Sequence, residues 1–251
     1  MTTYHIRLAL VLLENLFPDD NCKQVASYLN RKGPLPLRLL IRDMNLPAMT
    51  IARALATLSM HGIIEFHPDG DSNASQILYE FNLKRTLFIL HYSKCIHCAR
   101  QLYGYDGELI IEELLLNGRQ RMSTILVKVY QRLIQAGKDP EQHSLQSIKE
   151  TFKSLVSAQF LQRLLVEETT SNMPKVTEHP VSNTNQVPEL TQDGWKYLLI
   201  NQQGTGESKT KTATPNLGDE KIFWRVNFQR FFAHLRDQEL IAAFQNRIDQ
   251  V

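Results

Sequence analysis

The order of short elements in the first third of the chain constrains its fold more than any other feature of the sequence. Gly33-Pro34 and Gly62 are helix-ending signals, and Asp69-Gly70 is a hairpin-turn signal between two runs of β-branched and aromatic residues. Periodicity predicts helices over 4–17, 21–32, 37–43 and 47–61 and strands over 63–67 and 77–81. This order of helices, turn and hairpin is typical of a winged-helix domain.

The first of these helices is predicted to be amphipathic. Its apolar stripe recurs at helical spacing and consists of Leu8, Val11, Leu12 and Leu16. Arg7 and Glu14 lie off the stripe, and Pro18 ends the helix. The apolar stretch is far shorter than the roughly 20 residues that a membrane helix needs, so we expect no membrane partner.

The pattern of the first domain returns later in the chain at a constant offset. Ile51, Leu55, Leu58, Ile63 and Ile64 fall on Ile148, Phe152, Leu155, Phe160 and Leu161. Helices are also predicted over 84–103, 108–116, 122–133 and 144–158, and Ser123 can cap the third of them. A second winged helix is therefore predicted to end at about Val166.

The composition changes after the second domain. Residues 167–220 are rich in Thr, Ser, Asn, Gln, Pro and Gly, which predicts a flexible linker. Within it, residues 195–200 are apolar and are either a short docking strand or helix or an apolar stretch tolerated in a disordered segment. Helical periodicity resumes over 223–250. Its apolar stripe consists of Trp224, Phe228, Phe231, Phe232, Leu235, Ile241 and Phe244. Such a helix is not stable alone in water, so we expect it to pack on a partner or on a further domain.

The predicted fold class is mainly α with short β-hairpins, arranged as tandem, extended winged-helix domains. The predicted organisation is a first winged-helix domain over 1–83, a second over 84–166, a flexible linker over 167–220 and the first helix of an incomplete third winged-helix domain over 221–251.

The charge balance limits contact with nucleic acid, and the number of cysteines indicates the redox compartment. Lys and Arg number 28 against 26 Asp and Glu, so any contact with nucleic acid must be local. Three cysteines fit a reducing compartment. Cys95 and Cys98, with His91 and His97 nearby, leave a zinc-dependent module open as an alternative, although no second Cys/His pair follows at finger-like spacing.

The sequence contains no recognisable catalytic constellation. Glu112-Glu113 and Asp19-Asp20 are adjacent carboxylates, which point to different sides of a helix and are expected to be solvated. Gly-rich phosphate loops and nucleophile elbows do not occur. We therefore expect no catalytic residue, cofactor, metal or small-molecule substrate.

Winged helices often read DNA through the last helix of the helix-turn-helix, but here that helix carries few basic residues. The candidate nucleic-acid contacts are Arg53, Lys84, Arg85, Arg119, Arg121, Lys149 and Lys153. Two or three phosphate contacts support only weak, non-specific binding. A free-standing winged-helix DNA-binding regulator is the alternative that these residues leave open.

Two blocks of sequence resemble one known family. The stretch Gly107-Glu-Leu-Ile-Ile-Glu-Glu-Leu-Leu-Leu-Asn-Gly118 with Met122-Ser123 resembles a hallmark of the winged-helix subunit of RNA polymerase III, the largest member of a three-subunit subcomplex. Trp224 to Gln250 is similar to a second block of that family, and the segment from Leu35 onward is similar more weakly. The family has four extended winged-helix domains and a coiled coil, so the resemblance implies a truncated, N-terminal part.

The resemblance also implies a function. The family's subunit is non-catalytic, sits on the clamp of the polymerase's largest subunit, binds the two other members of its heterotrimer and helps to open promoter DNA. It implies a nuclear protein whose partners are other polymerase III subunits and whose DNA contact is weak and non-specific. The candidate protein-interface residues are Trp224, Phe228, Phe231, Phe232 and Leu235.

Overall fold

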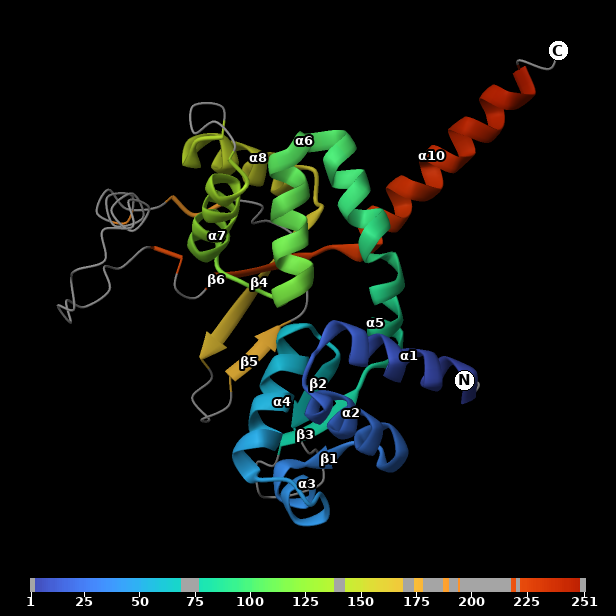
Figure 1. Ribbon diagram of the computed structural model, residues 1–251, viewed down its shortest axis with the longest axis vertical. Helices are drawn as coiled ribbons and strands as arrows, with labels where there is room; N and C mark the ends of the chain where they lie inside the picture. The colour runs from blue at the N-terminus through green and yellow to red at the C-terminus, as the bar shows by residue number, and fades with distance from the viewer. Residues whose placement is uncertain are drawn as a thin grey trace. The chain divides into compact units, whose positions relative to one another are not determined.

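The computed structural model describes residues 3–68, 77–137, 143–168, 174–177, 187–189, 194, 218–219 and 222–248. The chain folds as two compact units (Figure 1). Unit 1 comprises Met1–Ser93 with Leu116–Gly118, and unit 2 comprises Lys94–Leu115 with Arg119–Val251. The predicted boundary after residue 83 therefore lies ten residues too early, because the segment that follows it packs on the first helix of unit 1. Within the described residues, no helix is both long and apolar enough to span a bilayer.

Unit 1 is a winged helix with one additional helix in front. Its elements are α1 (Thr3–Leu16), α2 (Asp20–Lys32), β1 (Leu35–Pro36), α3 (Leu37–Asp43), α4 (Ala48–Met60), β2 (Ile64–Pro68), β3 (Ile77–Phe81), α5 (Leu83–Leu87) and the 3-10 helix η1 (Phe88–His91). The three strands form an antiparallel sheet in the order β1-β3-β2. The helices and hairpin predicted over 4–81 are confirmed, whereas the single helix predicted over 84–103 is divided into α5, η1 and the start of the next helix.

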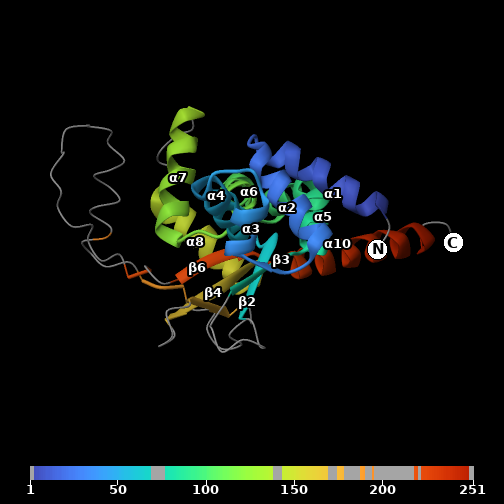
Figure 2. The same ribbon diagram turned by 90° about the horizontal axis from the view of Figure 1, so that it is seen from below.

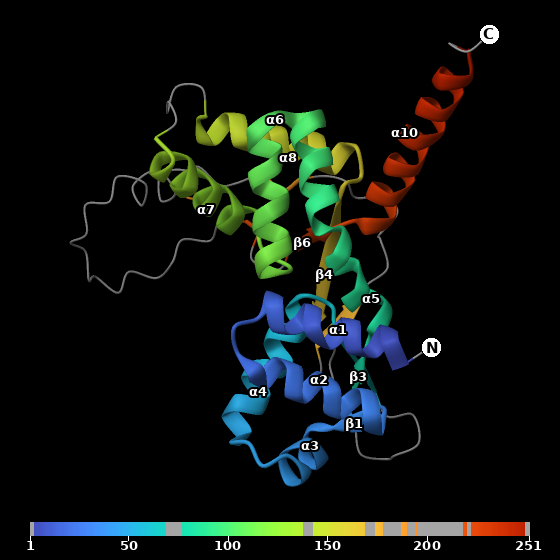
Figure 3. The same ribbon diagram turned by 45° about the vertical axis from the view of Figure 1, so that its right-hand side comes forward.

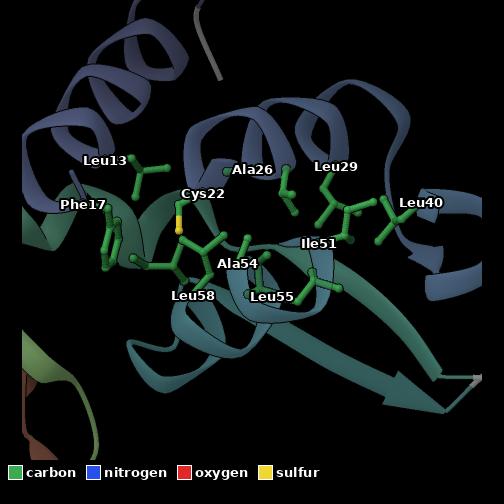
Figure 4. Packing of buried hydrophobic residues seen from close by; sticks show 13 residues of the cluster. Leu13, Phe17, Cys22, Ala26, Leu29, Leu40, Ile51, Ala54, Leu55 and Leu58 are labelled. Atoms are coloured by element: carbon green, nitrogen blue, oxygen red, sulfur yellow. The ribbon is translucent and has the colours of Figure 1, made fainter. Parts of the chain in front are cut away.

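The core of unit 1 lies between α2, α4 and the sheet. Ile51, Leu55 and Leu58 of α4 are buried, as their spacing predicts, and Figure 4 shows them facing Cys22 and Leu29 of α2. Local signals fix the ends of α2. The side chain of Asp19 accepts a hydrogen bond at the N-terminus, and Gly33 ends the helix with a φ of 84° that favours glycine.

The orientation of α1 differs from the prediction. Ala9 and Leu13 are the buried residues of this helix, whereas Leu8 and Val11 are exposed. Apolar residues occur on most of the circumference of α1, so periodicity could not decide which side packs inward. With Tyr4, which is 79% exposed, Leu8 and Val11 form an outward apolar stripe.

Unit 2 is a second winged helix. Its elements are all but the ends of α6 (Tyr92–Asn117), together with α7 (Met122–Gln135), α8 (Leu145–Ser157), β4 (Leu161–Glu168), β5 (Pro174–Thr177), β6 (Ile222–Val226) and α10 (Phe228–Ile248). Gly104, with a φ of 70°, breaks α6 between the two helices that the sequence predicts there. The sheet has the order β5-β4-β6, and Figures 1 and 2 show α7 and α8 beside it.

Residues 222–226 were predicted as the start of a helix, and this is wrong. They form β6, which pairs antiparallel with β4 in the register Arg163↔Trp224. The predicted linker is also too wide, because β5 within it pairs with β4. Residues 195–200, the apolar island, lie outside the described residues. That α10 begins a third winged helix stays a prediction.

Candidate docking and nucleic-acid surfaces

The basic residues of unit 1 differ in how accessible they are. Arg53 and Lys84 are exposed. Arg85 is half-buried: its Nε lies 3.5 Å from the carbonyl oxygen of His61, and its guanidinium lies 5.9 Å from the centre of the Phe88 ring. Arg53 and Lys84 are therefore available to a phosphate, whereas Arg85 is already engaged within the fold.

The basic residues predicted as nucleic-acid contacts in unit 2 are less exposed to solvent than Arg53 and Lys84 of unit 1. Arg119, Arg121 and Lys153 are half-buried, and the guanidinium of Arg121 lies 5.6 Å from the centre of the Phe223 ring. Lys149 is only 7% exposed, and burial lowers the pKa of its ammonium group. Lys149, a predicted nucleic-acid contact, is therefore hardly accessible to a phosphate, because the face of α8 that carries it turns inward.

The outward face of α4, where a DNA-reading winged helix carries its recognition residues, is apolar. Its exposed residues are Ala48, Met49, Ala52, Arg53, Ala56 and Met60. Met49 is 65% exposed, and the single cation on this face is Arg53. Phosphates are bound by hydrogen-bond donors, and base edges are read mainly by donors and acceptors. Alanine and methionine side chains provide no donor and no strong acceptor.

The equivalent helix of unit 2 also presents few cations. The exposed residues of α8 are Gln146, Glu150, Ser154 and Ser157. Glu150 accepts a hydrogen bond from Gln146 at 3.1 Å. A carboxylate at the centre of this face repels phosphate. Neither α4 nor α8 therefore presents the basic residues with which a recognition helix contacts DNA.

The aromatic residues predicted as a protein interface fall into two groups. Trp224, Phe228 and Phe231 are buried in unit 2, where the Trp224 ring meets Phe152 edge-on at 5.4 Å. They belong to the core, because β6 brings Trp224 inward, and their assignment to an interface is wrong. Phe232 and Leu235 are half-buried and remain candidates.

The exposed apolar surface of α10 lies further along the helix. Figures 1 and 3 show α10 running away from the end of β6. Leu240, Ile241 and Phe244 are 51%, 57% and 64% exposed. Sequence periodicity identified Ile241 and Phe244 as apolar-stripe residues but could not separate the packed first turns from the exposed later ones.

One pair of predicted solvated carboxylates is partly buried instead. The Glu113 side chain accepts hydrogen bonds from Lys128 Nζ at 2.8 Å and from Gln120 Nε2 at 3.0 Å. Its neighbour Glu112 pairs with Arg132 at 2.9 Å. Glu113 is 4% exposed, so it ties α6 to α7 rather than facing solvent.

The cysteine pair does not resemble a zinc site. Cys95 and Cys98 are both buried, and burial raises the pKa of the Cys95 thiol to about 12. Zinc requires thiolates, which such an environment disfavours. In the described part of the chain, no three His, Cys, Asp or Glu residues are grouped so that they could hold a metal ion.

Sequence reasoning missed a long-range cap on α7. Ser123, which was predicted to cap this helix, instead donates its backbone N–H to Asp219 Oδ2 at 2.7 Å. Asp219 is fully buried and lies within the predicted linker. No local pattern signals a cap that comes from nearly a hundred residues away.

Comparison with known proteins decides the family. Residues 7–69 match the family model of the RNA polymerase III subunit RPC82 helix-turn-helix domain, and residues 140–251 match that of RNA polymerase III subunit RPC82. The chain belongs to the RPC82 family of RNA polymerase III subunits. The resemblance drawn from the sequence is thereby confirmed, and so is the winged-helix fold class.

Members of this family from several organisms align with all or most of the chain. It is 32% identical to DNA-directed RNA polymerase III subunit RPC3 of Danio rerio and of Homo sapiens, over 100% of this chain and 49% of each relative. The subunit of the same name from Scheffersomyces stipitis is 23% identical over 91% of this chain and 39% of its own length. The chain thus spans about half the length of the first two of these relatives.

Proposed function

We propose that the chain acts as a non-catalytic subunit of DNA-directed RNA polymerase III. In this role it is a scaffold on the polymerase clamp that aids promoter opening and initiation at genes for small non-coding RNAs. Its partners are the clamp of the largest subunit and the two other members of the heterotrimer, and its compartment is the nucleus. Membership of the RPC82 family supports the proposal.

The observation that carries the scaffold role is the outward face of α4. Alanine and methionine side chains cover it, and Met49 at its start is largely exposed. Burial of apolar surface on a partner is favourable by about 25 cal/mol per Å², whereas DNA offers this face no comparable apolar surface. The face therefore favours docking onto protein over reading of base edges.

Contact with DNA is proposed to be weak and independent of sequence. Arg53 and Lys84 are exposed cations of unit 1, and Arg119, Arg121 and Lys153 offer partial exposure in unit 2. Each neutralised phosphate contributes about 0.9 to the salt dependence of binding, so few contacts give weak binding at physiological salt. A free-standing regulator would need a denser set of donors on α4.

Co-purification tests the proposal. The tagged chain, expressed in cells that hold the polymerase, is expected to recover polymerase III subunits, whereas a tagged winged-helix protein of another family serves as the control. Recovery of no polymerase III subunit would overturn the scaffold role. A gel-shift series against salt tests the alternative: tight, sequence-dependent binding that survives about 150 mM salt would favour the regulator.

A further inference from the structure

An open groove of about 540 Å³ runs along one side of α2 in unit 1. One face of α2 forms its floor, Leu10 of α1 lies on one side, and the turn between α3 and α4 lies on the other. The opposite face of α2, which carries Cys22, Ala26 and Leu29, packs into the core (Figure 4). We call this feature the α2 groove.

Four apolar or aromatic side chains line the α2 groove beside the polar residues Lys23, Gln24 and Ser27 of its floor. Leu10, Tyr28, Met44 and Leu46 are half-buried: each packs on the core of unit 1 and also lines the groove. The Tyr28 hydroxyl donates to Asp43 Oδ2 at 3.0 Å, so the ring is held in place. These side chains offer an apolar contact strip that unit 1 itself leaves partly open.

The two ends of the α2 groove carry opposite charges. Asp20 lies in the first turn of α2 and Arg31 in the last. Neither has an ion pair among the described residues, and the guanidinium of Arg31 lies 5.9 Å from the centre of the Tyr28 ring. The charges between them are compensated, because Lys23 pairs with Glu14 and Asp43 binds Arg42 at 2.7 Å. At 1.5 Å per residue, Asp20 and Arg31 lie about 16 Å apart along the helix axis.

A helix fits this groove better than an extended peptide or a small ligand. The backbone groups of α2 are bonded within the helix, so the floor offers an extended strand no backbone partners, whereas a helix satisfies its own backbone. A helix of three turns spans about 16 Å and reaches both charged ends. Helices favour acidic residues near the N-terminus and basic ones near the C-terminus, so one that complements Asp20 and Arg31 runs antiparallel to α2.

We propose that the α2 groove binds one amphipathic helix of another protein, antiparallel to α2. The bound helix has an acidic residue near its N-terminus opposite Arg31, a basic residue near its C-terminus opposite Asp20, and apolar side chains between them. That the helix belongs to another polymerase subunit rests on the function proposed above, whereas the groove's preference for such a helix does not.

Two stapled, fluorescent helical peptides test the proposal by fluorescence anisotropy with the full chain. Both carry the same leucine stripe; one has Asp in its first turn and Arg in its last, and the second has these charges exchanged. We expect the first to bind the natural chain about tenfold more tightly. The doubly substituted chain D20K/R31E is expected to invert this preference. Lys32→Glu, an exposed substitution outside the groove with the same charge change as Arg31→Glu, is the control and should leave the preference unchanged.

Each outcome bears on the proposal. Inversion of the peptide preference by D20K/R31E, with the far-UV circular dichroism of the natural chain retained, supports it. The proposal is overturned if neither peptide binds, or if the double substitution does not invert the preference between them. Self-association of the chain that Arg31→Glu abolishes would assign the groove to a second copy and would also overturn it. Because the assay contains no polymerase, failure here leaves co-purification with the polymerase as a separate result.

Discussion

Trp224→Ala tests whether this ring belongs to the core of unit 2 or to a docking surface. Trp224 has no exposed surface, its ring meets Phe152 edge-on at 5.4 Å, and its backbone exchanges hydrogen bonds of 2.8 and 3.1 Å with Gln120. Truncation of a buried tryptophan typically costs about 3–5 kcal/mol, of which an edge-to-face pair contributes about 1 kcal/mol. We expect the free energy of unfolding of unit 2 to fall by about 4 kcal/mol.

Urea unfolding followed by far-UV circular dichroism measures this change without relying on the indole that is removed. With a slope of about 2 kcal/mol per M, the midpoint of unit 2 should fall by about 2 M. Phe244→Ala is the matched control, because this ring is 64% exposed and its loss should change stability by less than about 0.5 kcal/mol. An unchanged midpoint for Trp224→Ala, together with lost partner binding, would refute the core assignment and restore the docking role.

Three further predictions concern pH, a partly buried ion pair and the outward face of α4. Burial, and secondly Arg85, lowers the pKa of His61 to about 4 from 6.5, so the unfolded chain binds the proton first. The contribution of neutral His61 to stability is therefore complete above pH 6.5, and the free energy of unfolding should fall by about 3 kcal/mol as the pH drops to 4. In His61→Gln, the free energy of unfolding measured against pH should lose this slope. An unchanged slope would contradict the assignment of the pH dependence to His61. Glu113→Ala leaves Lys128 and Gln120 without their shared acceptor and should cost about 1–3 kcal/mol in urea unfolding, whereas Glu113→Gln should cost less. Met49→Glu should leave the urea midpoint unchanged and reduce the recovery of polymerase III subunits severalfold; full recovery would argue against docking through α4.

Local sequence was sufficient for most of unit 1. The helix predicted over 37–43 and the strand over 77–81 have the observed bounds. Turn and capping residues such as Gly33 act within a few positions of themselves, so their effect is visible in the sequence. The repeat of apolar positions likewise identified the second winged helix, and Phe152 and Leu155 are buried there as predicted.

The candidate surfaces were predicted less well. Arg53 and Lys84 are exposed as expected, whereas Lys149 is buried and Arg85 is engaged. A helical repeat shows that α8 has two faces, but a lysine stem can lie along either of them. The α2 groove was not predicted at all, because its walls come from three elements and no single segment of sequence records them.

The sequence by itself determined most elements of unit 1, their order and the family, because helix periods, turn residues and two family blocks are local patterns. Only the tertiary structure decided which side of an element is covered. Residues 222–226 carry apolar residues that suit a helix stripe or a strand, and pairing with β4, some sixty positions earlier, made them a strand. The same pairing buried Trp224, and Asp219 reached Ser123 to cap α7. Burial depends on neighbours that are distant along the chain. The sequence of a helix such as α1, which is apolar on most sides, therefore does not determine which of its faces is buried.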